Sequence, residues 1–457
     1  MRFDDTIAAI ATPLQPSGLG VIRVSGEQAV SAVEALFKTN GKPLKKTETH
    51  KLVHGWIKDD VKLIDKVLVV VMRAPHSYTT EDVVEIQCHG SPFVLRIILD
   101  LVLRQGVRLA DAGEFTQRAF LHGRLDLTQV EAISDLIQAS SEIGARLAAQ
   151  QLRGKLFHAI DAVKKQVVSI ASLVEASIEF PEEEHEFTHQ EDCLLRLDQA
   201  SADLESLLSH ADRGIQIRDG FSVVLIGRPN VGKSSLLNTL LREQRAIVTA
   251  IPGTTRDSIE ESVQIQGLAF RLTDTAGIRI TEDLIESEGI RRTQNVREKA
   301  DLVLLILDAS EKLMDEDLSL ISEVEKERTI VVLNKKDLMD DTTPRWYEKI
   351  SLLESVLISA KTGEGCDELE SSLYKKATLG GLPQEDEIWI TNRRQQQAAK
   401  NALSALFSAR KSLNQSSGEE FLAVDLRSCL NALGEIVGET TPDDLLGQIF
   451  SDFCIGK

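Results

Sequence analysis

A glycine-rich segment that ends in a lysine and a serine is the strongest chemical signal in the sequence. Residues 227–234 read GRPNVGKS and match the pattern GxxxxGK[ST], between an apolar run and an amphipathic stretch. Glycines let a backbone approach phosphates closely, and the loop N–H groups with the following helix N-terminus stabilise their charge. We expect Lys233 to reach the β- and γ-phosphates and Ser234 to hold Mg²⁺. The predicted P-loop contacts are Asn230, Val231, Gly232, Lys233, Ser234 and Ser235.

Three later motifs, each at the end of an apolar run, indicate which nucleotide is bound. DTAG at 274–277 offers an aspartate that reaches Mg²⁺ through water and a glycine N–H that senses a γ-phosphate. NKKD at 334–337 offers Asp337, whose carboxylate accepts two hydrogen bonds from guanine that adenine cannot give. SAKTG at 359–363 resembles the loop behind the base. The order of these motifs along the chain predicts a domain that binds a guanine nucleotide. Its further contacts are Asp274, Thr275, Ala276, Gly277, Asn334, Lys335, Asp337, Ser359, Ala360 and Lys361.

The group that activates water is less clear from the residues. Thr255 in GTTRD is the expected switch-loop ligand of Mg²⁺ when a γ-phosphate is present. Ile278 follows DTAG, where Ras-like proteins carry a glutamine that orients the attacking water. Because no histidine follows His210, a histidine base within this domain is excluded. Three glutamates of the next loop are candidates, and each is otherwise a solvated loop charge: Glu282, Glu286 and Glu288.

These motifs need a sheet that brings strand ends together, and the chain pattern predicts one. From 221 to about 377, short apolar runs alternate with helical stretches. LVLLILD, TIVVLN and SVLIS are continuous apolar runs, typical of strands buried on both faces of a parallel sheet. Residues 1–120 mix strand and helix signals. From Leu127 the chain is helical, and apolar residues between 156 and 174 recur every three or four positions.

We therefore expect a multidomain α/β and α fold in four segments. Residues 1–120 form an N-terminal α+β domain, and residues 121–215 begin a helical domain. Residues 216–378 form an inserted Ras-like P-loop GTPase domain, with a mostly parallel sheet and helices on both faces. Residues 379–457 complete the helical domain and end in the CIGK motif.

Composition limits the partners and the compartment. The 52 basic and 71 acidic residues give a net charge of −19, so nucleic acid cannot bind over the whole surface. Five widely spaced cysteines exclude a disulfide scaffold and a CxxC zinc site, and they favour a reducing compartment. No signal peptide is apparent, and no apolar stretch approaches the roughly 20 residues of a membrane span. We expect a cytoplasmic protein that does not contact membranes.

Over essentially its whole length the sequence resembles the bacterial tRNA modification GTPases of the MnmE (TrmE) family. The segments that carry the resemblance are DTIAAIATP, SYTTEDVVEIQCHG, GEFTQRAFLHGRLDLTQVEA, the GTPase motifs with AIVTAIPGTTRD, and the terminal DDLLGQIFSDFCIGK. The resemblance implies a three-domain homodimer held by N-terminal folate-binding domains. It also implies a partner, the FAD- and NADH-binding flavoprotein MnmG. Together they add an aminomethyl or carboxymethylaminomethyl group to the 5-position of the wobble uridine in certain tRNAs.

The resemblance also assigns roles around the nucleotide. Asn230 matches the family's K⁺ ligand, and the loop AIVTAIPGTT implies further K⁺ oxygens from Thr249, Ile251 and Thr254. K⁺ beside the phosphates would take the place of an arginine finger, a side chain that accelerates hydrolysis by roughly 10³–10⁵. The resemblance also implies that the GTPase domains of two chains meet when GTP and K⁺ bind. Glu286 falls on the catalytic glutamate and would orient water through a second water. The loop's nucleotide contacts are Thr249, Ala250, Ile251, Pro252, Gly253, Thr254 and Thr255.

A tetrahydrofolate derivative, in the 5,10-methylene or 5-formyl form, supplies the one-carbon unit in the family. The matching folate positions are Arg23, Glu85, Arg124 and Lys457. The chain departs from the family pattern in having His-Gly-Arg at 122–124 instead of Asn-Gly-Lys, and Ser91 instead of a glycine. Arginine and lysine present their donors differently. Without the resemblance, Arg23 and Glu85 are interpreted as surface groups or a strand-end ion pair.

Cys454 in CIGK matches the family's catalytic-site cysteine. A helix start at 441–444 and an apolar face that includes Phe450 and Phe453 would anchor it. Three alternatives remain: a buried cysteine beside those phenylalanines, a CaaX box, and a flexible tail.

Two classes of function are compatible with the residues. The first is an enzyme component whose GTPase cycle gates tRNA modification. The second is a regulatory switch, such as a ribosome-assembly or septation GTPase. The N-terminal module and the CIGK terminus favour the first, because a pure switch needs neither. Short basic pairs at 291–292 and 393–394 are candidate tRNA contacts, although exposed helix charges explain them too, and the partner can carry the phosphate contacts.

Overall fold

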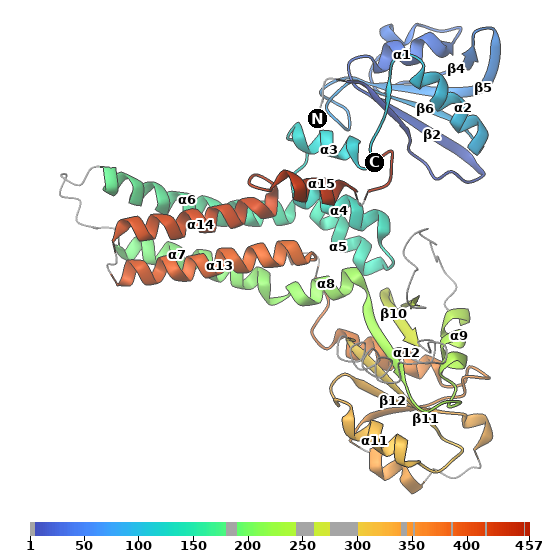
Figure 1. The fold of residues 1–457 in the computed structure, drawn as a ribbon, viewed down its shortest axis with the longest axis vertical. Helices are drawn as coiled ribbons and strands as arrows, with labels where there is room; N and C mark the ends of the chain where they lie inside the picture. Colours follow the sequence, from blue (N-terminus) through green and yellow to red (C-terminus); the bar gives the residue numbers. More distant parts are fainter. Residues whose placement is uncertain are drawn as a thin grey trace, which may run out of the picture. The chain divides into compact units, whose positions relative to one another are not determined.

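The computed structural model describes residues 5–179, 190–243, 260–274, 300–339, 345–350, 352–384, 387–415, 418–451 and 453–457 (Figure 1). The chain divides into two compact units. The first comprises Met1–Ser134, Gln151–Ala200 and Asn401–Lys457. The second comprises Asp135–Gln150 and Ser201–Lys400.

The first unit opens with a seven-stranded sheet in the order β3-β4-β5-β6-β2-β1-β7. The strands are β1 (Ile7–Ile10), β2 (Ser17–Ser25), β3 (Phe37–Lys38), β4 (Leu52–Asp59), β5 (Lys62–Met72), β6 (Val83–Gly90) and β7 (Arg108–Leu109). Neighbours pair antiparallel, except β1 with β7. Helices α1 (Ala29–Leu36) and α2 (Pro92–Leu103) pack on it through one apolar core. A 3₁₀ turn covers Leu44–Lys46, and α3 (Glu114–Leu121) follows β7. The expected α+β domain is confirmed.

Helices make up most of the remaining described part of the first unit, and some of them continue along the chain into the second unit. They are α4 (Leu127–Gln138), α6 (Lys155–Glu179), α7 (Gln190–Ser209), α13 (Arg393–Asn414), α14 (Glu419–Val437) and α15 (Asp443–Ser451). Helices α6 and α14 pack along each other, as Figure 1 shows. The predicted stripe of α6 is buried at all six positions: Leu156, Ile160, Val163, Val167, Ile170 and Val174. Burial of this stripe confirms the interpretation of its three-to-four spacing.

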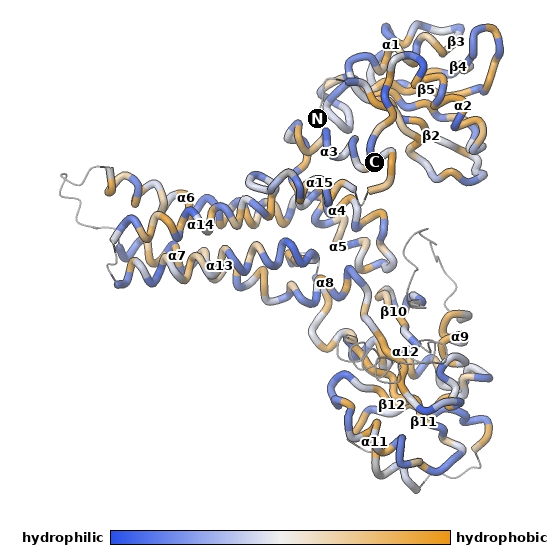
Figure 2. Tube along the Cα trace, viewed as in Figure 1, coloured by the Kyte–Doolittle hydropathy of each residue, from blue (hydrophilic) through white to orange (hydrophobic). Residues whose placement is uncertain are grey.

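The second unit contains a six-stranded sheet in the order β13-β12-β11-β8-β10-β9. The strands are β8 (Phe221–Ile226), β9 (Glu260–Ile265), β10 (Leu268–Asp274), β11 (Leu302–Asp308), β12 (Thr329–Asn334) and β13 (Glu354–Leu357). Only β9 runs antiparallel among these described strands. Every residue of β11 and β12 is buried, as predicted for strands covered on both faces. Figure 2 shows hydrophobic residues gathered on the strands of both sheets.

Helices cover both faces of this sheet. Alternate residues of β11 belong to different cores, because successive side chains of a strand point to opposite faces. Helices α9 (Lys233–Glu243) and α12 (Cys366–Thr378) pack into one core, and α11 (Asp315–Glu323) packs on the other. Helices α5 (Glu142–Leu152) and α8 (Ala211–Asp219) also belong to this unit, with 3₁₀ turns at Lys336–Leu338 and Arg345–Ile350. Within the described ranges, no helix has the length and apolar character needed to cross a membrane.

Candidate functional site

The loop between β8 and α9 has the backbone that the P-loop motif requires. Asn230 has a φ of +64° and Gly232 a φ of +99°. Asparagine adopts this left-handed region more readily than most residues. A Cβ atom at position 232 would lie 2.1 Å from the side-chain nitrogen of Asn334, so only glycine fits there. The segment GRPNVGKS therefore folds into a tight loop at the start of a helix.

Lys233 and Ser234 are the first two residues of α9, directly after this loop. The Lys233 ammonium donates hydrogen bonds to the carbonyls of Gly227 and Arg228, both at 2.8 Å. The Ser234 hydroxyl donates to Asp274 Oδ2 at 2.8 Å, at the end of β10. The serine and the aspartate predicted to serve Mg²⁺ are thus adjacent, and hydroxyl and carboxylate oxygens are ligands that Mg²⁺ prefers. Ser235 is exposed on the next position of α9.

The NKKD and SAKTG motifs meet at the same place. The side-chain amide of Asn334 donates to the Val231 carbonyl at 2.7 Å, and its oxygen accepts from the Ala360 N–H at 2.9 Å. Asn334 therefore ties the P-loop to the SAKTG loop. Ser359 donates to Asp337 Oδ1 at 2.7 Å, which orients the carboxylate expected to read guanine. Lys361 is exposed.

Asp308 is a further site residue that sequence reasoning missed. It ends β11, and its Oδ2 lies 2.6 Å from the Lys335 ammonium. Burial raises the pKa of Asp308, but hydrogen bonds from Lys335 and Ser310 outweigh burial and leave that pKa below its ordinary value. The carboxylate therefore stays charged and holds Lys335 in place. The sequence feature that indicates Asp308 is the aspartate that ends the apolar run LVLLILD.

Parallel pairing explains why these motifs converge. Strands β8, β10, β11, β12 and β13 are parallel, so their carboxyl ends lie at one edge of the sheet, where α/β proteins bind ligands. Several predicted residues lie outside the described residues. They are Thr249, Ala250, Ile251, Pro252, Gly253, Thr254, Thr255, Thr275, Ala276, Gly277, Ile278, Glu282, Glu286, Glu288 and the pair at 291–292.

The four residues matched to a folate site come together in the first unit, and we call them the N-terminal cluster: Arg23, Glu85, Arg124 and Lys457. Arg23 on β2 and Glu85 on β6 are cross-strand neighbours and form an ion pair at 2.9 Å. Both side chains are mostly buried, which agrees with the ion-pair alternative and is also compatible with a binding role. The guanidinium carbons of Arg23 and Arg124 lie 5.3 and 5.4 Å from the ring centroid of Tyr78.

The CIGK segment docks beside this cluster. Ile455 forms an antiparallel bridge with Ala112, the Gly456 carbonyl accepts a 3.4 Å hydrogen bond from Arg23, and the Lys457 carbonyl accepts from the Phe115 N–H at 3.2 Å. Phe450 and Phe453 are buried, and Cys454 is exposed. The alternative of a buried, packing Cys454 is therefore wrong. The other four cysteines are buried.

Helix α3, whose Phe115 ring centroid lies 5.6 Å from the Arg23 guanidinium carbon, also carries a buried ionic network. Arg118 on α3 is fully buried. It donates to Asp5 Oδ1 at 2.7 Å, Glu114 Oε1 at 2.8 Å and Glu81 Oε1 at 3.1 Å. Glu114 is an i,i+4 neighbour on α3, but Asp5 and Glu81 come from segments far apart in the chain, so local spacing does not predict the whole network.

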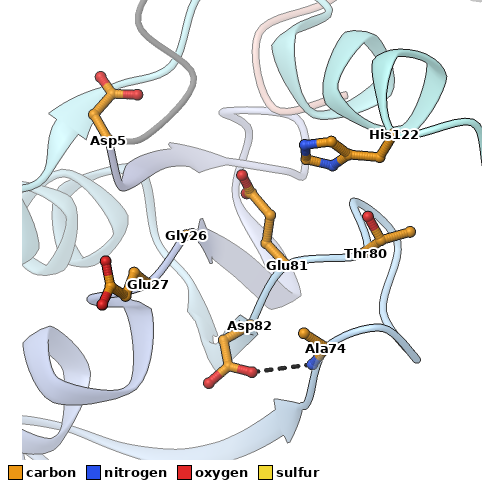
Figure 3. A pocket seen from close by; sticks show the side chains of 8 residues that line it. All are labelled: Asp5, Gly26, Glu27, Ala74, Thr80, Glu81, Asp82 and His122. Atoms are coloured by element: carbon orange, nitrogen blue, oxygen red, sulfur yellow. Dashed lines mark hydrogen bonds between the residues drawn. The ribbon is translucent and has the colours of Figure 1, made fainter.

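A cavity of about 590 Å³ opens beside the network (Figure 3). Its lining residues are Asp5, Gly26, Glu27, Ala74, Thr80, Glu81, Asp82 and His122. Asp5 and Glu81 pair with Arg118, and Asp82 pairs with Arg73 while accepting from the Ala74 N–H at 3.0 Å. Arginines therefore offset most of the negative charge around this cavity.

The Ras-like sheet, with the P-loop, NKKD and SAKTG motifs at one edge, defines a guanine-nucleotide-binding protein of the P-loop class. Two family models match the chain: the N-terminus of the GTP-binding protein TrmE at residues 6–124, and the MnmE helical domain at residues 127–454. The chain belongs to the MnmE family of tRNA modification GTPases.

Individual relatives agree with the family models. A tRNA modification GTPase MnmE from Alkaliphilus oremlandii is 42% identical over 469 residues, covering 100% of both chains. The same protein from Moorella thermoacetica is 45% identical over 467 residues, again covering 100% of both. Among solved structures, the G domain of the FeoB iron transporter from T. maritima is 27% identical, with a TM-score of 0.27, covering 35% of this chain and 99% of that chain.

Proposed function

We propose that this chain is the GTP-hydrolysing component of a system that modifies the wobble uridine of tRNA. It acts in the cytoplasm as a homodimer with an FAD-dependent partner of the MnmG type. Together they add an aminomethyl or carboxymethylaminomethyl group at the 5-position of the uridine. The supporting observation is that one chain carries both a guanine-nucleotide site and the N-terminal cluster beside an exposed cysteine, which a pure switch does not need.

The nucleotide site would work mainly by positioning and charge. The P-loop N–H groups and the Lys233 ammonium hold the phosphates, while Asp337 and Asn334 select guanine. Ser234 and Thr255 would hold Mg²⁺, with Asp274 acting through water. Asn230, Thr249, Ile251 and Thr254 would hold K⁺. When bound, the two cations neutralise charge that develops on the phosphates.

Water activation falls to Glu286 in this proposal, through a second water molecule. Ile278 supplies no hydrogen bond, so the site needs a group from elsewhere in the following loop. The GTPase domains of two chains would meet around their nucleotides when GTP and K⁺ bind, which makes hydrolysis depend on that pairing.

The N-terminal cluster suits a reduced folate, in the 5,10-methylene or 5-formyl form. The Arg23–Glu85 pair offers donors and an acceptor that match a pterin edge. Arg124 and Lys457 offer cationic groups for the anionic glutamate tail. Cys454 is exposed and lies three positions before Lys457 in the sequence, so its thiol would be accessible to a bound one-carbon donor or to the uridine.

Complementation of a strain that lacks its own MnmE tests the function. We expect this chain to restore the modified wobble uridine, measured by mass spectrometry of nucleosides from purified tRNA. Cys454→Ser should fail to restore the nucleoside while the purified variant keeps potassium-stimulated GTP hydrolysis. Failure of this chain to restore the modified nucleoside would favour the alternative of a regulatory switch.

A further inference from the structure

The P-loop carries an arginine, Arg228, to which the proposed function gives no role. Arg228 is the second residue of the segment GRPNVGKS. Its Nε donates a 2.8 Å hydrogen bond to the carboxylate of Asp317, in the first turn of α11. The side chain of Asp317 is 1% exposed and that of Arg228 is 15% exposed. Because a buried carboxylate is tolerated only when it is paired, this contact fixes the end of the arginine side chain.

Asp317 is itself held in place. Its Oδ2 accepts a 3.0 Å hydrogen bond from the N–H of Met314, the residue before α11. Leu320 and Ile321 of α11 pack into the apolar core on one face of the sheet, whereas α9 packs into the core on the other face. Arg228 therefore joins the P-loop to a helix on the opposite face of the sheet from α9.

The backbone of Arg228 contacts the lysine that is expected to bind phosphate. The Lys233 ammonium donates hydrogen bonds to the carbonyls of Gly227 and Arg228, both at 2.8 Å. Gly227 is pressed against β11, since a Cβ atom there would clash with the Ile306 carbonyl. The position of the second carbonyl depends on how Arg228 is anchored. The ion pair with Asp317 thus helps to aim the Lys233 ammonium.

The charge of Arg228 is already matched within the protein. Besides Asp317, the carboxylate of Glu311 lies 3.6 Å from Nη2 of the guanidinium. A guanidinium between two carboxylates has little net charge to offer a phosphate. Arg228 therefore contributes through its backbone carbonyl and not through direct contact with the nucleotide.

The loop has a second anchor a few residues further along. The side-chain amide of Asn334 donates to the Val231 carbonyl at 2.7 Å. Between the two anchors lie only Pro229, whose ring fixes its own φ, and Asn230. Release of Arg228 should therefore move the start of the loop, while the N–H groups after Val231 stay in place.

We propose that Arg228 and Asp317 are a positioning pair for GTP hydrolysis, which fixes the Arg228 carbonyl and through it the Lys233 ammonium. The inference rests on the GTP hydrolysis of the proposed function and deepens it. Lys233 would meet the β- and γ-phosphates, where charge shifts during phosphoryl transfer. The later N–H groups bind the phosphates in the ground state as well. Loss of the pair should therefore slow the chemical step more than it weakens nucleotide binding.

Steady-state GTP hydrolysis by the full-length protein, in KCl and MgCl₂, tests the proposal. Asp317→Asn removes the charge and keeps an acceptor for the Met314 N–H. Its kcat should fall about tenfold, because a small displacement of a group that contacts the reacting phosphate is costly, while KM should change less than about threefold. Arg228→Lys keeps the charge but not the planar guanidinium, and should show the same split. It serves as the second variant if Asp317→Asn does not fold, as judged by thermal unfolding.

A matched control separates positioning from a general loss of stability. Asp135 on α4 pairs with Arg218 on α8 at 2.7 Å, and its side chain is 8% exposed. Helix α8 leads into the start of β8, whereas the P-loop follows the end of that strand. Asp135→Asn should therefore lower the midpoint of urea unfolding and leave both kcat and KM unchanged.

The double variant shows whether the two residues act as one unit. Arg228→Lys combined with Asp317→Asn should be about as slow as the slower single variant, because either change already breaks the pair. Losses that multiply, a rise in KM alone, unchanged kcat in both single variants, or an equal loss in the Asp135 control would overturn the positioning role. Wild-type protein that does not hydrolyse GTP would overturn the proposed function and this inference together.

Discussion

We expect Asp337 to set the choice of base in this site. Ser359 already donates to Oδ1, so the carboxylate is oriented before guanine arrives. Asp337→Asn replaces an acceptor by a donor and should weaken GTP by several kcal/mol, at roughly 1.5–3 kcal/mol for each charged hydrogen bond. Xanthosine triphosphate should bind better than in wild type, because its edge offers an acceptor there. Equilibrium titration with both nucleotides measures the exchange, and unchanged GTP affinity would contradict it.

Hydrolysis should depend on K⁺ and on Glu286. In the proposed site the Asn230 side chain and the oxygens of Thr249, Ile251 and Thr254 would hold K⁺, whereas Na⁺ is smaller and should support little turnover. Glu286→Ala should slow hydrolysis at least a hundredfold, as loss of a group that positions water does, while nucleotide affinity stays near normal. Phosphate release in KCl and in NaCl measures both effects. Equal rates in the two salts, or a fully active variant, would remove these assignments.

Glu114 links stability to pH. Burial raises the pKa of Glu114, but hydrogen bonds from Arg108, from the Asp111 N–H and from Arg118 outweigh burial and leave that pKa below its ordinary value of 4.5. A carboxyl with a depressed native pKa stabilises the fold fully above its unfolded pKa and loses this contribution as the pH falls through the native pKa. Stability from this group should therefore decline below about pH 4.5.

Glu114→Gln tests this assignment. Urea unfolding at pH 7 should show a loss of about 3 kcal/mol, since Arg118 loses a buried charged partner. At pH 3.5 the difference from wild type should be smaller. Glu420→Gln, an exposed change at the start of α14, serves as the control and should be neutral. A pH-independent difference would show that the carboxylate charge is not the stabilising feature.

At the scale of elements, the docked C-terminal segment depends on Gly456. This residue has a φ of +98°, and a Cβ atom would lie 2.3 Å from the Ile10 carbonyl oxygen. Gly456→Ala should therefore displace Cys454 and Lys457 from the N-terminal cluster. We expect modified wobble uridine to fall at least tenfold, while GTP hydrolysis, which belongs to the other unit, stays normal.

Gly447→Ala is the matched control for this change. Gly447 lies on α15, and a Cβ atom there meets nothing within 4 Å. Both activities should survive in the Gly447 variant. Loss of modification in both variants, or in neither, would show that docking of the segment is not the feature that matters.

The elements also show what sequence can and cannot predict. Strands β11 and β12 were predictable because burial on both faces demands uninterrupted apolar residues, and α6 because a buried stripe demands a helical period. The P-loop, NKKD and SAKTG contacts were predictable because each motif sits at a strand end. The Arg118 network, the contact of Tyr78 with two arginines, and the Asp308–Lys335 pair were not, because tertiary proximity rather than local spacing creates them.

At the scale of the whole molecule, the two proposed chemistries occupy different units. The nucleotide site belongs to the second unit and the N-terminal cluster to the first. A variant that alters ligand binding in one unit should therefore leave equilibrium binding in the other intact unless the ligands are coupled. Measured coupling between GTP and folate binding would have to be reciprocal.

The uneven exposure of the five cysteines makes the chain a natural candidate for site-selective labelling. Burial raises the pKa of Cys88 to about 11 and that of Cys429 to about 12, and Cys193 and Cys366 are buried as well. Alkylating reagents react with accessible thiolates. A maleimide should therefore add once to the native protein, at Cys454, and five times in denaturant, as counted by intact-protein mass spectrometry. Two or more additions to the native protein would contradict this expectation. A single addition would allow a fluorophore attached to Cys454 to report whether the C-terminal segment is docked.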